Sequence, residues 1–466
     1  MRILFASAEL VPVVSVGGLG AAAAGLVDEL RRQGVDVEVV LPDYGETRLD
    51  DERRRVLDLA PWVGPAAVRS GRHAEAGRLH LVSVPGMARP HPYTDADGKG
   101  WPDNDHRFFA FGLAIARLAS DLDADILHVN DWHTASALAA SDPEIPTILS
   151  IHNLAYQGTT DASWLDRLGT RSAAFGRNGE CNPLAGAIAL ADAVVVVSPT
   201  YRDEILHREH GCGLDDLLAS RGDALVGILN GIDTTSWDPA TDPALVRRSA
   251  AASPAAKATN RAAVRSEVGL PEQPCPLIVA VTRLVDQKGI DLLLPSVEFL
   301  ATMPAQLAIL GAGEPWLVAA LHDAAARLPD TVAFVDGYDD GLARRLIAGG
   351  DLLVMPSRFE PCGLTQMQAM RYGTLPIATD VGGLHDTIVD LDRSPDRGTG
   401  WLASDPSPMA ILDALHRAIR GWSVATRRRA AQQRAMATDW SWQVPARRYR
   451  ETYARLVGSP VDTVSP

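Results

Sequence analysis

The chain alternates short apolar runs with longer segments in which apolar residues recur at helical spacing. Short apolar runs predict buried strands, and amphipathic segments between them predict helices. A first series of strands is expected at 3–8, 35–41, 79–84, 126–129, 147–151 and 193–197, with helices that include 22–32 and 107–121. A second series is expected at 277–282, 306–310, 331–334, 352–355 and 374–378. This alternation predicts an α/β fold with mainly parallel, doubly wound sheets.

The two strand series predict two Rossmann-like domains with a ligand cleft between them. A chain of 466 residues is too long for a single hydrophobic core. We expect an N-terminal domain at 1–240, an Ala/Pro-rich linker at 241–275, a C-terminal domain at 276–440, and at 441–466 a helix that returns to the first domain, followed by a tail. Nucleotide-sugar transferases and periplasmic-type binding proteins share this architecture, so the function must be inferred from the sites.

Composition and charge narrow the classes of function. Hydrophobic residues make up 46% and charged residues 22% of the chain, which is typical of globular proteins. No apolar run is long enough for a membrane span, the N-terminus lacks signal-peptide features, and the four cysteines show no metal-binding spacing. We therefore expect a cytoplasmic protein with reduced thiols and no membrane partner. The net charge of −14 disfavours nucleic acid as a partner, so an anionic substrate would need a local cationic pocket.

The most informative motif is the stretch 356–366, Pro-Ser-Arg-Phe-Glu-Pro-Cys-Gly-Leu-Thr-Gln, which follows the apolar run 352–355. The pattern places Glu360 in a loop between a strand and a helix. Open α/β folds bind ligands at this carboxyl edge of the sheet. The candidate ligand-binding residues of this loop are Glu360, Cys362, Gly363, Leu364 and Thr365.

Other polar residues follow neighbouring strands. Asp131 follows the strand at 126–129, whereas His152 and Asn153 follow the strand at 147–151, so these residues could converge on one ligand. In the second domain, Arg283 and Lys288 follow a strand and can supply two cations to a diphosphate.

Several loops add candidate contacts. Gly17 and Gly18 lie between the first strand and a helix, where backbone amides attract phosphate. The spacing is not that of the dinucleotide fingerprint, which argues against a dehydrogenase. The long loop 92–104 offers Tyr93, Asp95 and Trp101 as sugar-facing groups, unless it is simply a solvated surface loop. Gly382, Gly383 and Thr399 mark further amide-lined turns.

From residue 1 to about 456 the chain resembles the bacterial glycogen synthases and plant starch synthases, which are retaining glycosyltransferases of the GT-B class. The matching strings are 92–104, 131–133, 152–158, 198–201, 229–233, Arg283 with Lys288, 360–366 and 440–443. The resemblance implies that Arg283 and Lys288 neutralise the diphosphate of the donor and that Glu360 holds sugar hydroxyls. It also implies that His152 lies under the reacting sugar with Asp131 beside it, that Tyr338 lies near the nucleobase, and that neither metal nor cofactor is needed.

The chain departs from the family pattern at five positions. Two family lysines and an aspartate are replaced by Ser15, Ala185 and Ala21, and the chain carries Gln368 and Val381 where the family usually has an aromatic residue and a threonine. We expect all five to face the donor or the closing cleft and to weaken glucosyl-donor binding, since a charged hydrogen bond contributes about 1.5–3 kcal/mol.

These departures leave three interpretations open. The first, which we favour from the sequence, is a diverged transferase with a donor other than ADP-glucose and a small natural-product sugar or aminocyclitol as acceptor. The second is a glycogen synthase that elongates α-1,4-glucan from ADP-glucose, and the third is an inactive sugar-binding relative. In either transferase the partners are a nucleotide-sugar donor and a hydroxylated acceptor. The oligomeric state does not follow from the sequence.

Overall fold

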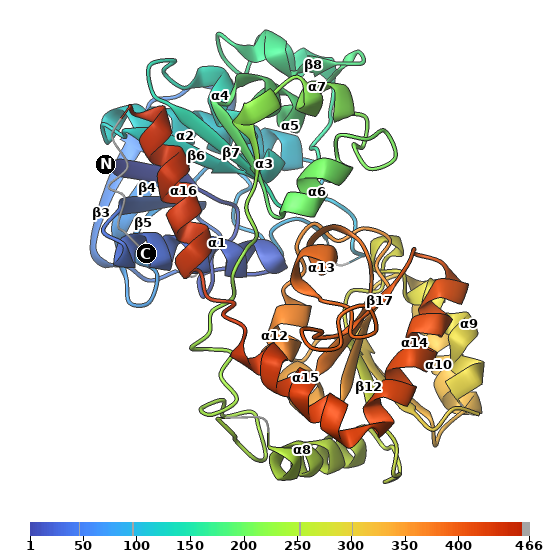
Figure 1. The fold of residues 1–466 in the computed structure, drawn as a ribbon. Coiled ribbons are helices and arrows are strands. Elements are labelled where there is room, and N and C mark those ends of the chain that lie inside the picture. The colour runs from blue at the N-terminus through green and yellow to red at the C-terminus, as the bar shows by residue number, and fades with distance from the viewer. Residues whose placement is uncertain (46, 96, 251–252, 301, 459–466) are drawn as a thin grey trace. The chain divides into compact units, whose positions relative to one another are not determined.

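The computed structural model describes residues 1–458 except 46, 96, 251–252 and 301. The chain divides into two compact units (Figure 1), one formed by Met1–Gly231 with Trp442–Pro466 and the other by Ile232–Ser441. Residues 459–466, the end of the expected tail, lie outside the described residues.

The first unit is built on a large sheet with the strand order β11-β10-β7-β6-β1-β2-β5-β4-β3. Pairing is parallel from β11 to β5, which confirms the expected doubly wound sheet. The strands are β1 (Arg2–Ala6), β2 (Asp36–Pro42), β3 (Asp50–Leu57), β4 (Ala66–His73), β5 (Gly77–Ser83), β6 (Ile126–Asn130), β7 (Thr147–Ile151), β10 (Ala193–Val196) and β11 (Leu225–Gly227). The helices of this unit are α1 (Gly18–Arg32), α2 (Asn104–Asp121), α3 (Asp131–Ala135), α4 (Ala137–Ala140), α5 (Pro183–Leu190), α6 (Pro199–Glu204), α7 (Asp215–Ala219) and α16 (Gln443–Leu456).

The antiparallel strands β3 and β4 were not predicted from the sequence. β3 has the sequence Asp-Asp-Glu-Arg-Arg-Arg-Val-Leu, and only its last residue is buried. A charged strand at the edge of a sheet carries no apolar alternation to reveal it, and its charges discourage pairing with another chain.

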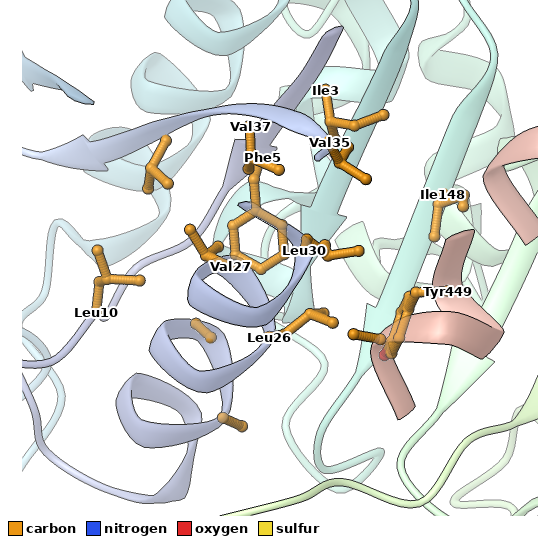
Figure 2. Packing of buried hydrophobic residues seen from close by; sticks show 14 of the residues in the cluster. Ile3, Phe5, Leu10, Leu26, Val27, Leu30, Val35, Val37, Ile148 and Tyr449 are labelled. Atoms are coloured by element: carbon orange, nitrogen blue, oxygen red, sulfur yellow. The ribbon is translucent and has the colours of Figure 1, made fainter. Parts of the chain in front are cut away.

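Helix α1 carries an apolar stripe that packs on the sheet (Figure 2). Leu26, Val27 and Leu30 are buried in one cluster with Phe5 of β1. The last helix, α16, belongs to this unit and contributes Tyr449 to the same cluster. Residues from both ends of the sequence therefore share one core.

The contact between α1 and Trp442, just before α16, requires a glycine. A Cβ atom at Gly25 would lie 2.0 Å from Nε1 of Trp442. We expect Gly25→Leu to lower the free energy of unfolding by about 1–3 kcal/mol, because overpacking displaces the buried indole. Denaturant unfolding measures the effect, with Ala21→Leu, at an exposed position of the same helix, as the matched control. Equal stability of the two variants would show that the indole moves without cost.

The second unit contains a parallel sheet with the strand order β14-β13-β12-β15-β16-β17. Its strands are β12 (Leu277–Val281), β13 (Gln306–Gly311), β14 (Val332–Asp336), β15 (Leu352–Met355), β16 (Leu375–Thr379) and β17 (Trp401–Ala403). Its helices are α8 (Pro254–Glu267), α9 (Ile290–Leu300), α10 (Pro315–Arg327), α11 (Asp340–Gly349), α12 (Thr365–Arg371), α13 (Gly382–Thr387), α14 (Pro408–Ser423) and α15 (Ala425–Ala437).

The segment predicted as a linker, 241–275, is instead part of the second unit. Helix α8 lies in it and packs against α11, with Val264 buried in the core of the unit. The alanine-rich sequence hid the helix, because few strongly apolar residues mark its buried face. Ser253 caps the helix by accepting the N–H of Ala256, and Pro254 follows at the first helical position. Ser253 and Pro254 were the residues from which the start of this helix could have been predicted.

Candidate functional site

In the second unit, a lysine and a glutamate meet at the carboxyl edge of the sheet. Lys288 follows β12 and Glu360 follows β15, which is the parallel neighbour of β12. Nζ of Lys288 lies 2.6 Å from Oε2 of Glu360, and Ser357 donates its hydroxyl to the same oxygen at 3.0 Å. The side chains of Lys288 and Glu360 are 19% and 5% exposed. Lys288 and Glu360 therefore form a direct ion pair within one unit.

Glycines allow the loops around this pair to approach closely. A Cβ at Gly289, where φ is +63°, would lie 1.9 Å from the carbonyl oxygen of Pro356. Gly383 donates its N–H to the carbonyl of Glu360 at 2.9 Å, and a Cβ there would lie 2.1 Å from the carbonyl oxygen of Cys362. Gly363 has a φ of +69°. The loops after β12, β15 and β16 are thus packed backbone to backbone, which fixes the Lys288–Glu360 pair.

Two further predicted residues follow strands of this sheet. Arg283 is exposed just beyond β12. Tyr338 follows β14 and is 81% exposed, so its ring is available for stacking. Leu364 is the N-cap residue of α12, and Thr365 is the first residue of that helix. The roles assigned to these residues stay predictions.

Thr399 does not join this group. It precedes β17, which runs parallel to β16, so it lies at the amino edge of the sheet. Its hydroxyl accepts the N–H of Val389 at 3.1 Å. The Gly-Thr-Gly turn therefore closes a loop at the opposite end of the strands from Glu360.

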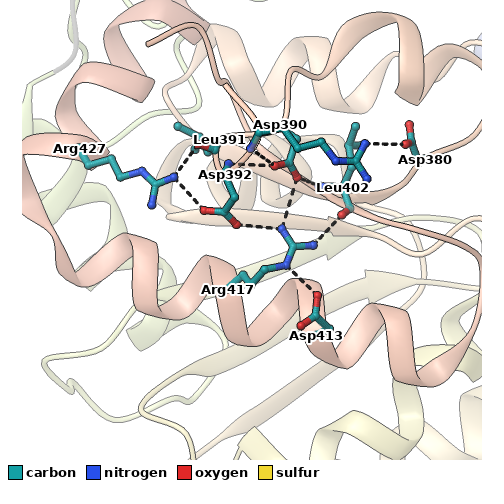
Figure 3. Close-up of polar contacts among 9 residues, drawn as sticks. Asp380, Asp390, Leu391, Asp392, Leu402, Asp413, Arg417 and Arg427 are labelled. Atoms are coloured by element: carbon teal, nitrogen blue, oxygen red, sulfur yellow. Dashed lines mark hydrogen bonds and ion pairs between the residues drawn. The ribbon is translucent and has the colours of Figure 1, made fainter. Parts of the chain in front are cut away.

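An ion-pair network holds the loop that contains Thr399 (Figure 3). Asp390 accepts the N–H groups of Asp392 and Leu402 and pairs with Arg417, while Arg427 donates to the carboxylate of Asp392. Although burial opposes ionisation, these backbone hydrogen bonds hold the pKa of Asp390 below its ordinary value. The network is structural, because it ties the loop to Arg417 of α14 and Arg427 of α15.

In the first unit, the residues expected to converge at the ends of β6 and β7 do meet. The carboxylate of Asp131 accepts the backbone N–H of His152 at 2.7 Å and that of Asn153. Asp131 has a φ of +53°, a conformation that aspartate and asparagine tolerate better than most residues. Burial raises the pKa of Asp131 to about 7, against the lowering effect of the two N–H donors.

The contacts of His152 indicate which of its ring nitrogens carries the proton. Asn130 donates its side-chain NH₂ to the carbonyl of Ala6 at 2.9 Å, which turns its amide oxygen towards Nε2 of His152 at 3.0 Å. Nε2 therefore carries the proton and Nδ1 retains its lone pair. Burial lowers the pKa of His152 to about 4, so the imidazole is uncharged at neutral pH. Sequence reasoning did not identify Asn130 as a positioning residue, although it directly precedes Asp131.

Glu9 is a second residue that sequence reasoning missed. Its Oε2 accepts the N–H groups of Val16 and Gly17 at 2.6 and 3.1 Å, and its Oε1 accepts the hydroxyl of Tyr93 at 2.7 Å. The amide of Gly17 thus binds a carboxylate of the chain itself instead of being presented to phosphate, while Gly18 begins α1 beside it. Burial, followed by the charge of Glu9, raises the pKa of Tyr93 well above its ordinary value.

The loop 92–104 uses its polar groups largely to fold itself. Oδ1 of Asp95 accepts the N–H groups of Asp97 and Lys99, and Trp101 donates its indole N–H to the carbonyl of His91 at 2.9 Å. The expectation that Asp95 and Trp101 face a sugar stays a prediction.

The five departures from the family pattern do not share one environment. Ser15 and Ala21 are exposed, Gln368 is half-buried on α12, and Ala185 and Val381 are buried. Val381 packs in a cluster with Leu384 and Leu402. The expectation that all five side chains face a ligand is therefore wrong for Val381, whose side chain belongs to the core of its own unit.

Two further observations concern metals and membranes. Within the described residues, no group of three or more histidine, cysteine, aspartate or glutamate side chains could hold a metal ion. None of the described helices combines the length and apolar character that a membrane-crossing helix needs.

Comparisons with known proteins agree with the two-unit architecture. Residues 2–220 match the family model of the starch synthase catalytic domain, and residues 261–435 match that of glycosyl transferases group 1. The chain is 40% identical to a glycogen synthase from Halorhodospira halophila over 98% of this chain and 100% of the relative. It is 39% identical to a glycogen synthase from Alkalilimnicola ehrlichii over 98% and 99% of the two chains.

Solved structures give the same result. The catalytic domain of starch synthase IV from Arabidopsis thaliana, bound to ADP and acarbose, superposes with a TM-score of 0.87 at 32% identity, covering 98% of this chain and 99% of that one. A sucrose-phosphate synthase from Thermosynechococcus elongatus has a TM-score of 0.62 at 18% identity and shares the fold alone.

The two Rossmann-like units and these matches define a GT-B glycosyltransferase that uses a nucleotide-sugar donor. The chain belongs to the glycogen and starch synthase family of hexosyltransferases. The comparisons favour the glycogen synthase interpretation over the small-molecule acceptor that the five departures suggested, and they give no support to a role in natural-product biosynthesis.

Proposed function

We propose that the enzyme elongates α-1,4-glucan by transferring glucose from ADP-glucose to the non-reducing end of the chain. The observation that carries the proposal is the full-length similarity to proteins named glycogen synthase, at 40% identity over nearly all of both chains. The relative solved with ADP and acarbose supports an adenine nucleotide as the leaving group and a glucan-like acceptor.

The ion pair in the second unit suits the donor. A lysine ammonium has three donors, so Lys288 can bind Glu360 and a phosphate oxygen together. Arg283, which is exposed just beyond β12, would add a second cation. In the transfer, the bond between C1 of glucose and the diphosphate oxygen breaks and a bond from C1 to the acceptor oxygen forms. The acceptor proton passes to the departing phosphate, whose charge Lys288 and Arg283 stabilise.

The first unit suits a neutral sugar. His152 is uncharged and its free Nδ1 can accept a hydroxyl proton in a hydrogen bond, while Asp131 orients the backbone that carries it. An uncharged imidazole adds no repulsion as positive charge develops at C1.

We further propose that transfer requires no metal ion, since Lys288 and Arg283 supply the cations that a diphosphate needs. Activity in EDTA is expected to stay within about twofold of the untreated rate, measured as ADP release. Loss of turnover in EDTA that magnesium or manganese restores would refute this.

A panel of donors and acceptors tests the assignment. Purified enzyme would be incubated with ADP-glucose, UDP-glucose or a deoxyhexose nucleotide, each with glycogen, maltoheptaose or an aminocyclitol, and the products identified by mass spectrometry. The proposal predicts addition of successive hexose units to the glucans, with ADP-glucose preferred. Transfer of a single sugar to the aminocyclitol, without glucan elongation, would instead support the diverged small-molecule enzyme suggested by Ser15, Ala21 and Ala185.

A further inference from the structure

Away from the Lys288–Glu360 pair, the second unit contains a cavity formed by α8, the end of α12, α15 and the segment before α8. Its lining includes Lys257, Arg247, Asn260, Tyr372 and Gln432. Lys257 is one of three lysines in the chain, the others being Lys99 and Lys288. The family assignment gives this cavity no role.

The hydrogen bonds of Lys257 fit an uncharged amine. Nζ donates to the carbonyl of Tyr372 at 3.2 Å and to the hydroxyl oxygen of Thr374. Thr374 is fully buried, and carbonyl oxygens of Ile347 and Gly350 lie within hydrogen-bonding distance of its hydroxyl, so that oxygen can accept from the amine. Two acceptors match the two hydrogens of a neutral amine and leave its lone pair free, whereas an ammonium group would need a third acceptor.

The charged groups around Lys257 are largely committed to other partners. Asp351 binds the guanidinium of Arg261 at 2.7 and 3.0 Å, and Asp242 accepts the hydroxyl of Tyr372 at 2.5 Å. Among the described residues, Lys257 forms no ion pair with a carboxylate. Burial lowers the pKa of Lys257 to about 7; Asp351 opposes this shift and Arg261 adds to it.

The cavity also offers a cation. Arg247 lines it with an exposed side chain, and the described residues provide its guanidinium with no ion-pair partner. Its backbone is fixed, because its N–H and carbonyl bind the side-chain amide of Asn260, both at 2.9 Å. Lys257 and Arg247 line the same cavity, and a nucleophilic amine that shares a cavity with a guanidinium favours an electrophile that carries negative charge.

We propose that Lys257 is a modification site that anionic acyl donors of the acyl phosphate class acylate from this cavity. The lone pair of Nζ attacks the acyl carbonyl carbon and a C–N bond forms. The C–O bond to phosphate breaks, phosphate leaves with the electron pair, and the amine releases its surplus proton to solvent. Arg247 binds the phosphate of the donor before and during the transfer.

The experiment incubates the full-length enzyme with acetyl phosphate and quantifies acetylation of the three lysine peptides by mass spectrometry. Exposed Lys99 is the internal reference, and Lys288 is paired with Glu360. At pH 7 we expect Lys257 to react at least about tenfold faster than Lys99, because an ordinary lysine with a pKa of about 10.4 is almost entirely protonated. Its rate should level off above about pH 8 while that of Lys99 continues to rise. A rate at Lys257 no greater than that at Lys99, or a profile that follows Lys99, would overturn the proposal.

Arg247→Ala tests the role of the guanidinium without altering the nucleophile. The variant is expected to slow acetylation of Lys257 by acetyl phosphate at least about fivefold, as expected for a lost charge-assisted contact. Its rate with acetic anhydride, which is uncharged, should not change. An unchanged rate with acetyl phosphate, or an equal loss with both reagents, would overturn the assignment of an anionic donor.

Discussion

Replacing Lys288 with alanine is expected to lower kcat/KM for ADP-glucose by at least about tenfold, with most of the loss in kcat. The substitution removes a charge-assisted contact to the leaving diphosphate and leaves the buried carboxylate of Glu360 without its partner 2.6 Å away. A lost charged contact of about 1.5–3 kcal/mol corresponds to a factor of about ten to a hundred. Steady-state kinetics of ADP release measure the change.

Two companion variants sharpen this test. Lys99→Ala removes an exposed lysine of the first unit and should leave kcat/KM within about twofold of the parent. Arg283→Ala should also lose at least about tenfold, since Arg283 supplies the second cation in the proposed site. Near-normal kinetics of either Lys288→Ala or Arg283→Ala, with folding confirmed by circular dichroism, would show that the diphosphate is bound elsewhere.

Asp131→Asn is expected to change how stability depends on pH. Burial raises the pKa of Asp131 to about 7, above the value of about 3.9 in an unfolded chain. The contribution of its protonation is therefore fully present below about pH 4 and is lost as the pH rises through about 7. Asparagine keeps the shape and tolerates the φ of +53° but does not titrate.

Thermal unfolding of both proteins between pH 5 and pH 8 measures this effect. The Tm of the parent relative to that of Asp131→Asn should fall by roughly 5 °C across the range, because protonation of Asp131 contributes about 2–3 kcal/mol less stability at pH 8 than at pH 5. A constant difference in Tm would mean that Asp131 is ionised in the folded protein throughout and that its two N–H donors outweigh its burial.

Much of the fold could be predicted because its strands are continuous apolar runs. The strands β1, β6, β7 and β12 were expected within one or two residues of their bounds, since parallel strands buried on both faces leave no ambiguity. The charged edge strand β3 and the alanine-rich helix α8 carry weak apolar signals, and both were missed.

The placement of several candidate residues in the fold was predictable to a similar extent, while their roles stay predictions. The strand ends predicted the positions of Lys288 and Glu360 in the second unit and of Asp131 and His152 in the first. Within each parallel sheet, the carboxyl ends of the strands lie at the same edge. The sequence could not reveal that Lys288 pairs with Glu360 directly, since residues 72 positions apart meet only through strand order. For the same reason the sequence could not show that the turn with Thr399, a candidate ligand contact, lies at the amino edge of β17 and so at the opposite edge of the sheet from Glu360.

The central claim is that the enzyme builds α-1,4-glucan from ADP-glucose, and growth of a defined primer tests it most directly. Maltoheptaose and ADP-glucose would be incubated with the enzyme, the chain-length distribution followed over time, and the new linkages identified by NMR. We predict a ladder of products that lengthen by single glucose units through α-1,4 linkages, at turnover in the range of about 1–1,000 s⁻¹ usual for metabolic enzymes. Absence of primer elongation by enzyme that binds ADP and transfers sugar to another acceptor would contradict the account.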